Sequence, residues 1–160
     1  MKVALVRSPC VNLPYPPSIG MAYISAALKK AGHEVFIFDL NIEIFHTVSD
    51  DDKKIWNISD VSGLFDFGEG IFHKYEQLFK EYIKRILETG VSVVGFSVWN
   101  TNVGLSLKLA KEIKQLNPDI KVIFGGPDCF PRWSGGSSAK NDYVDVVVYG
   151  EGEETITQVI

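Results

Sequence analysis

The sequence has few of the residues that indicate metal sites or disulfides. It contains two cysteines, Cys10 and Cys129, and three histidines among 160 residues. Two cysteines are too few for a disulfide framework, and we expect both to be reduced bystanders. The histidines, at positions 33, 46 and 73, lack metal-ligand spacing, so we predict no metal ion held by protein side chains.

Long hydrophobic runs and an excess of basic residues are also absent. The apolar runs are strand-sized, well short of the roughly 20 residues that cross a membrane. With 16 basic and 20 acidic residues the net charge is −4, which argues against nucleic-acid binding. The opening Met1–Val6 is too short for a signal peptide and leads straight into a predicted strand. We therefore expect a cytoplasmic protein with no membrane or nucleic-acid partner.

Several common sites are missing after the first predicted strand, which ends Arg7-Ser8-Pro9. A response regulator needs acidic residues here, and a flavodoxin needs a phosphate loop rich in Ser, Thr and Gly. The dinucleotide fingerprint Gly-x-Gly-x-x-Gly does not occur here either. We identify no catalytic residue in the chain.

What the sequence does contain is a repeated alternation of apolar runs and amphipathic stretches. Continuous apolar runs indicate strands that are buried on both faces, as in a parallel sheet covered by helices. The five predicted strands are Lys2–Arg7, Glu34–Asp39, Ser92–Ser97, Ile120–Phe124 and Val144–Tyr149.

Amphipathic stretches at Ser18–Ala31 and Val103–Leu116 predict helices between the strands. We therefore predict one α/β domain over residues 1–160, a doubly wound five-stranded parallel sheet of flavodoxin-like order 2-1-3-4-5. On composition alone, a six-stranded dinucleotide-binding order is almost as plausible.

Residues 41–90 form a longer connection than the dozen or so residues that a crossover needs. Its second half predicts one helix over about Ile71–Glu88 that covers the sheet. The first half carries Trp56, Phe65 and Phe67. We expect these aromatic residues to cap a ligand or to contact a partner domain.

Ligands of open parallel sheets bind outside the carboxyl ends of the strands, so the loops there supply the candidate site. Glycines let a ligand approach the backbone, and short polar side chains before a helix add hydrogen-bonding groups. Such loops suit a bulky planar or phosphate-bearing ligand. The candidates are Ser8, Pro9, Gly20, Ser97, Val98, Trp99, Asn100, Thr101, Gly125, Gly126, Pro127, Gly150, Glu151 and Gly152.

At these loops the sequence resembles the cobalamin-binding domains, and within them the amino-terminal domains of cobalamin-dependent radical S-adenosylmethionine (SAM) enzymes. Pro16–Ile24 is similar to the family's opening loop and first helix. Ser97–Trp99 followed by Gly125-Gly126 resembles its Ser-x-Leu and Gly-Gly pair, with Trp99 in place of Leu. Val146–Glu154 resembles its Gly-Glu-Gly-Glu ending.

The resemblance implies a corrinoid across the strand ends, with its nucleotide tail near Ser97 and the Gly125-Gly126 turn and with Gly150 and Gly152 on the far side. It implies a cobalamin-binding module, not catalytic alone, that positions methylcobalamin for a radical SAM domain downstream. The parent enzyme would be a methyltransferase that also uses a [4Fe-4S] cluster and SAM.

Two departures from the family patterns modify this expectation. Methionine-synthase-like domains bind cobalt from below with the histidine of Asp-x-His-x-x-Gly. Aligning Gly20 with its glycine places Pro17 at the histidine and Tyr15 at the aspartate, so we expect no lower histidine ligand. The radical family's Cys-x-x-x-Cys-x-x-Cys is also absent, so we expect an excised domain of a longer enzyme.

Two other functions stay open at this point. The same strand-end crevice would also suit a flavin- or nucleotide-binding protein. The third possibility is a domain that has lost its ligand and serves as an interaction surface.

Overall fold

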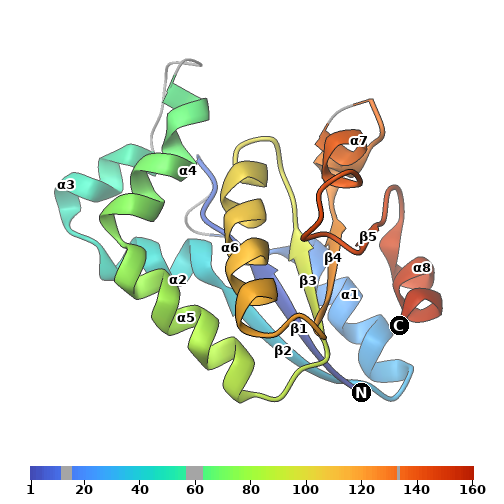
Figure 1. Ribbon diagram of the computed structural model, residues 1–160. Coiled ribbons are helices and arrows are strands. Elements are labelled where there is room, and N and C mark those ends of the chain that lie inside the picture. The colour runs from blue at the N-terminus through green and yellow to red at the C-terminus, as the bar shows by residue number, and fades with distance from the viewer. Residues whose placement is uncertain (12–15, 57–62, 133) are drawn as a thin grey trace.

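The computed structural model describes residues 1–11, 16–56, 63–132 and 134–160. Within them a five-stranded parallel sheet has the order β2-β1-β3-β4-β5, which confirms the predicted flavodoxin-like order over the six-stranded alternative. The strands are β1 (Lys2–Arg7), β2 (Glu34–Asp39), β3 (Val93–Ser97), β4 (Lys121–Gly125) and β5 (Val146–Val147). All their carboxyl ends point to the top of Figure 1.

The first four strands lie within one residue of their predicted bounds, but β5 is much shorter than predicted. The chain around β5 still bonds to β4, because Asp145 N–H donates to Val122 O at 2.9 Å and Val148 N–H donates to Phe124 O at 2.8 Å. Regular strand pairing is nevertheless limited to Val146 and Val147, which pair with Ile123 and Phe124.

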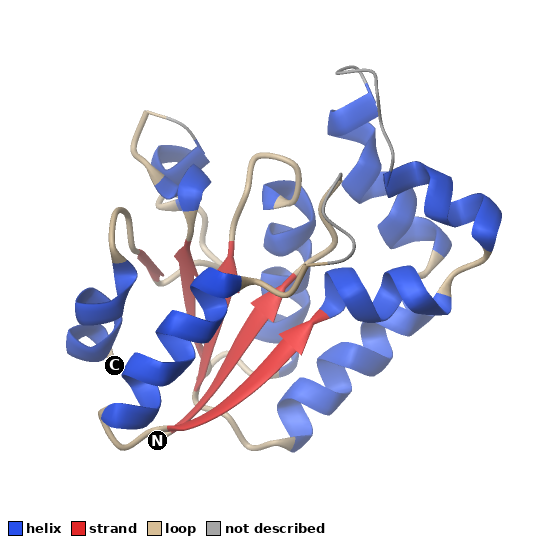
Figure 2. Cartoon of the chain, turned by 180° about the vertical axis from the view of Figure 1, so that it is seen from behind, coloured by secondary structure: helices blue, strands red, loops and turns tan. Residues whose placement is uncertain are grey.

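Helices cover both faces of the sheet, as the parallel arrangement requires. Helices α1 (Ile19–Lys30) and α8 (Gly152–Val159) cover one face, and α5 (Glu76–Glu88) and α6 (Val103–Leu116) cover the other (Figures 1 and 2). Helix α1 starts where expected, because the Ser18 hydroxyl accepts the Met21 N–H and so caps the first turn. No helix in the described parts of the chain is long and apolar enough to cross a membrane.

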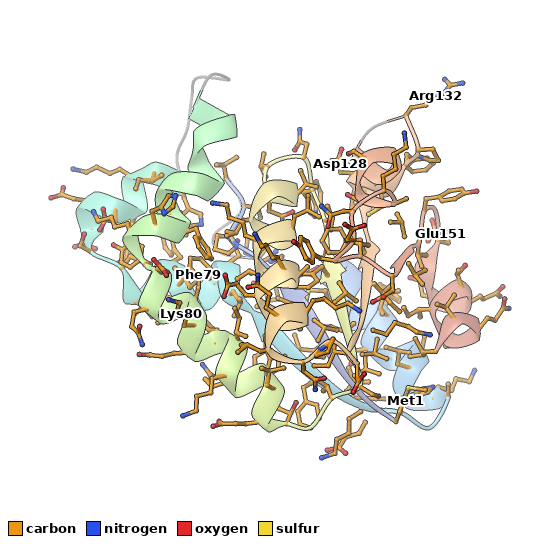
Figure 3. All side chains as sticks on the ribbon, viewed as in Figure 1. Met1, Phe79, Lys80, Asp128, Arg132 and Glu151 are labelled. Carbon is orange, nitrogen blue, oxygen red and sulfur yellow. The ribbon has the colours of Figure 1, made fainter. Side chains whose placement is uncertain are left out.

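Two separate hydrophobic clusters fill the two layers. The larger lies between the sheet and α5 and α6, where Phe79 and Ile83 of α5 are almost completely buried. Phe79 of α5 is fully buried, whereas the side chain of the adjacent Lys80 is 52% exposed (both are labelled in Figure 3), as expected for an amphipathic helix. The smaller cluster joins α1 and α8 to the sheet and includes Leu28 and Ile156.

The connection between β2 and β3 folds into α2 (Leu40–Thr47), α3 (Asp50–Lys53), the 3₁₀ turn η1 (Lys54–Trp56), α4 (Gly63–Lys74) and α5. The prediction of one helix over Ile71–Glu88 is wrong. The helix is interrupted at Tyr75, whose φ of −119° and ψ of 28° are not helical. The Tyr75 hydroxyl hydrogen-bonds to Asp52, and this contact ties the break to α3.

The aromatic side chains of this connection were expected to cap a ligand. Trp56 does not: it is 2% exposed, and its indole N–H donates to Asn41 Oδ1 at 2.9 Å. It is a core residue, because its large apolar surface is buried inside the connection and its single polar group has a hydrogen-bond partner there. The side chains of Phe65 and Phe67 lie outside the described residues.

A polar cluster around Asp52 fastens α3 to α4 and α5. The Asp52 carboxylate accepts hydrogen bonds from Lys74 and from the hydroxyls of Tyr75 and Ser49, and its side chain is 10% exposed. These donors, Lys74 foremost, lower the pKa of Asp52 to about 2. Burial, together with the Asp52 contact, raises the pKa of Tyr75 to about 12. The carboxylate is therefore ionised and bonded at neutral pH.

We expect Asp52→Asn to lower the melting temperature at pH 7, and the deficit to shrink as the pH falls from about 5 towards 2. The reason is linkage: a carboxyl whose pKa is lower in the folded state than its unfolded value of about 3.9 stabilises the fold only while it is ionised. Circular dichroism melts of both proteins across this pH range test it. Asp51→Asn is the control, because Asp51 is 91% exposed in a surface pair with Lys54 and should change little. A pH-independent Asp52→Asn deficit would contradict the prediction.

Candidate ligand-binding site

A cavity of about 660 Å³ lies between the sheet and the helices α1 and α8, and it extends to the loops after the strands. Its floor is the sheet itself, at Leu5, Gly95 and Ile123. Its walls include Ile24 of α1 and Ile156 of α8. The lining is predominantly apolar, as is usual for sites that enclose a large organic ligand.

The cavity exists because small residues occupy the upper half of one sheet face. Gly95 sits in the middle of β3, directly between Leu5 of β1 and Ile123 of β4 in the strand register. Two residues further along, on the same face, Ser97 pairs with Gly125. A glycine inside a central strand weakens the strand and often marks the close approach of a ligand. Sequence reasoning missed Gly95, although an isolated glycine in a strand pattern is a usable signal.

Most of the strand-end candidates from the sequence do line this cavity. They come from the loops after β1, β3, β4 and β5, which the fold brings to one edge. They are Gly20, Ser97, Trp99, Gly125, Gly126, Pro127, Gly150, Glu151 and Gly152. Glu151 and Asp128 both appear near the strand-end edge in Figure 3, whereas Met1 lies at the opposite end of the sheet.

Five other candidates do not line the cavity. Ser8 and Pro9 are buried, and the Ser8 hydroxyl lies 2.6 Å from that of Ser106 in α6. Val98 is fully buried in the larger core, while Asn100 is exposed and Thr101 is half-buried outside the cavity lining. The structure therefore gives Ser8 and Val98 packing roles.

Asn102 is a residue of this region that sequence reasoning missed. It is 1% exposed, and its Oδ1 accepts the Trp99 backbone N–H at 2.8 Å. Its Nδ2 donates to Ser8 O at 3.2 Å and to Ser97 O at 3.3 Å. One side chain thus joins the ends of β1 and β3 to the loop that carries Trp99. The only sequence signal for such a role was the position of this asparagine, directly before a predicted helix.

Arg7, the last residue of β1, was also missed as a site residue. Its side chain is 5% exposed, and its Nε lies 2.9 Å from Asp39 Oδ1. Its Nη2 donates to Pro16 O at 3.1 Å, which anchors the loop before α1. Arg7 also lines the cavity. A charged residue that ends an apolar strand needs a partner when it is buried, and Asp39 provides it.

The two cysteines are unpaired and buried. Burial raises the pKa of Cys10 to about 11 and that of Cys129 to about 12, so neither thiol is a nucleophile at neutral pH. The described residues include no group of three or more His, Cys, Asp and Glu side chains that could hold a metal ion.

These features define a class of protein: an open, doubly wound α/β domain with a large, mainly apolar cavity at the carboxyl ends of its strands, where such folds bind their ligands. The family model described as the B12 binding domain matches residues 68–160. The chain belongs to the B12-binding domain family.

Curated relatives are longer than this chain. It is 28% identical over 145 residues to the cobalamin-dependent radical SAM methyltransferase TokK of Streptomyces tokunonensis, covering 86% of this chain and 20% of that protein. It is 29% identical over 157 residues to the cytidylyl-2-hydroxyethylphosphonate methyltransferase of Streptomyces wedmorensis, covering 94% of this chain and 25% of that protein. The chain thus spans a fifth to a quarter of their length.

Solved structures share the fold. The radical S-adenosylmethionine methyltransferase TsrM of Kitasatospora setae, with its tryptophan substrate and a SAM analogue bound, superposes with a TM-score of 0.61 at 21% identity. The match covers 99% of this chain and 25% of that chain. A second TsrM structure, with cobalamin and a [4Fe-4S] cluster bound, has a TM-score of 0.56 at 22% identity with the same coverage.

Proposed function

We propose that this chain is the cobalamin-holding module of a longer radical SAM methyltransferase. The observation that carries the proposal is the apolar cavity of about 660 Å³ beneath the strand ends. A corrinoid is far larger than this volume, so only part of it would enter. The nucleotide tail ends in a flat aromatic base, and a slot with an apolar lining suits such a base. The macrocycle would then lie over the strand ends.

The residues that line the cavity fit a ligand whose aromatic base enters the cavity and whose macrocycle lies above it. Gly95 has no side chain at the floor, so a flat group can lie against the sheet between Leu5 and Ile123. At the mouth, Trp99 and Phe130 line the cavity and are 39% and 44% exposed. Large exposed apolar side chains around a cavity mark a surface that a ligand or partner covers. We propose that they contact the macrocycle.

We also propose that no histidine of this chain binds the cobalt from below. Pro17, which stands at the position of the family histidine when Gly20 is aligned with the glycine of that motif, lines the cavity. All three histidines lie elsewhere: His33 follows the end of α1, and His46 and His73 lie in α2 and α4. None of them is among the residues that line the cavity.

When bound, cobalamin would supply a transferable methyl group. The residues of this chain would hold and orient the ligand and exclude water from its tail.

The names of the relatives support a methyltransferase parent whose further domain holds a [4Fe-4S] cluster and SAM, and we expect that domain downstream. Both thiols are buried with raised pKa values, and no catalytic residue is assigned to this chain. The cytoplasmic location stays a prediction.

The test is retention of the ligand after desalting. The purified chain is incubated with hydroxocobalamin or with flavin mononucleotide, passed through a desalting column and measured by visible absorption. We expect about one corrinoid per chain and no flavin. Flavin retention without corrinoid would favour the flavodoxin-like alternative. Retention of neither ligand by a folded chain would leave the interaction domain as the surviving explanation.

A further inference from the structure

The cavity contains one buried cation whose role is only partly explained by the fold. Arg7 is the only basic side chain among the described residues that line the cavity, and it is 4% exposed. A guanidinium carries five N–H donors. Asp39 accepts from Nε and Pro16 O accepts from Nη2, while no described residue accepts a hydrogen bond from Nη1. Donor capacity therefore remains on the side chain.

The position of Arg7 lies between the floor and the mouth of the cavity. It is two residues beyond Leu5 on the same face of β1, because side chains alternate along a strand. It follows Val6, which pairs with Phe96, so it is level with Ser97 at the end of β3. Any group that links a base on the cavity floor to a macrocycle above the loops must pass the level of Arg7 and Ser97.

We propose that Arg7 binds the phosphodiester of the cobalamin nucleotide loop; this inference rests on the proposed function. In cobalamin the phosphate lies between the base and the macrocycle, and Arg7 occupies the corresponding level of the cavity. The planar guanidinium matches the oxygens of a phosphate, and hydrogen bonds between two charged groups are stronger than neutral ones. Asp39 holds the guanidinium by one edge, which fixes its orientation.

The described lining of the cavity also carries two carboxylates, Glu151 and Glu153, at the start of α8. Helix α8 follows β5, and three strand spacings, roughly 14 Å, separate β5 from β1. Asp39 lies much closer, because it accepts the hydrogen bond of Arg7 Nε at 2.9 Å. A phosphate would therefore bind through the guanidinium N–H groups that Asp39 and Pro16 O do not use.

The test compares two corrinoids, because cobinamide has the macrocycle of cobalamin but lacks the nucleotide loop and its phosphate. Spectral titration gives the affinity of the wild-type chain and of Arg7→Met for each. We expect Arg7→Met to lose 10- to 100-fold in affinity for hydroxocobalamin and less than twofold for cobinamide. An equal loss for both ligands, or no loss for either, would overturn the proposal. Failure of the wild-type chain to bind either ligand would instead refute the proposed function.

Arg7 also holds the Pro16 loop, so a loop effect must be separated from a phosphate contact. Ser18→Ala is the matched control: it removes the cap of α1 next to this loop and leaves the guanidinium in place, so it should affect both ligands alike. If Arg7→Met does not fold by circular dichroism, Arg7→Lys and Arg7→Gln replace it. In the wild-type chain, added KCl should weaken cobalamin binding more than cobinamide binding, and equal salt dependence would also overturn the proposal.

Discussion

Gly95→Ile should reduce cobalamin affinity by about a thousandfold and leave the protein folded. The new side chain would project from the middle of β3 into the floor of the cavity and occupy the place of the aromatic base. A buried aromatic group removes about 150–200 Å² of apolar surface from water, worth about 4 kcal/mol, which corresponds to about a thousandfold in affinity. Visible titration with hydroxocobalamin measures the loss.

The fold should tolerate this substitution. A Cβ at Gly95 would lie 3.2 Å from Leu5 Cδ2, which is the end of a flexible side chain next to an open cavity. A β-branched residue also suits a central strand, so we expect a change in stability of at most about 2 kcal/mol. Gly104→Ile is the control, because a Cβ there meets no atom within 4 Å and the residue does not line the cavity. Full cobalamin affinity in a folded Gly95→Ile protein would show that the base does not occupy this slot.

Gly126→Ala should lower the melting temperature by about 10 °C. Gly126 has φ of 123°, a conformation that is nearly restricted to glycine and costs other residues about 1–3 kcal/mol. A Cβ there would also lie 2.6 Å from Val98 O and 2.9 Å from Val98 N. These are backbone atoms of the neighbouring loop and cannot move aside separately. Together the two effects amount to about 3 kcal/mol or more, and each kcal/mol shifts the midpoint by about 2–4 °C for a chain of this length.

The adjacent glycine supplies the control for this experiment. A Cβ at Gly125 would lie 3.8 Å from Val148 O, an ordinary contact, so Gly125→Ala should stay close to the wild-type stability in thermal melts. Equal melting temperatures for Gly125→Ala and Gly126→Ala would contradict our account. The comparison also separates the structural roles of the two glycines. Gly125 leaves space beside the cavity, whereas Gly126 permits two loops to touch.

The sequence was sufficient to predict the fold and the edge of the sheet at which the site lies. Continuous apolar runs such as Lys2–Arg7 give buried parallel strands because both faces of the sheet are covered. Glycines and short polar residues after these runs mark the carboxyl ends, where parallel topology forces the loops together. These inferences need only local periodicity and one general rule of sheet architecture. The family came instead from the resemblance of the loop motifs, and the match over residues 68–160 confirms it.

The tertiary structure alone decided which residues of that edge line a cavity and which hold it together. Gly95 and Arg7 belong to the site because strand register places them on the same hollow face as Ser97. Ser8 and Val98 were reasonable site candidates, yet they bond or pack inward. Asn102 reaches Ser8 across 94 residues of sequence. Such contacts depend on how distant segments pack, and neither composition nor periodicity carries that information.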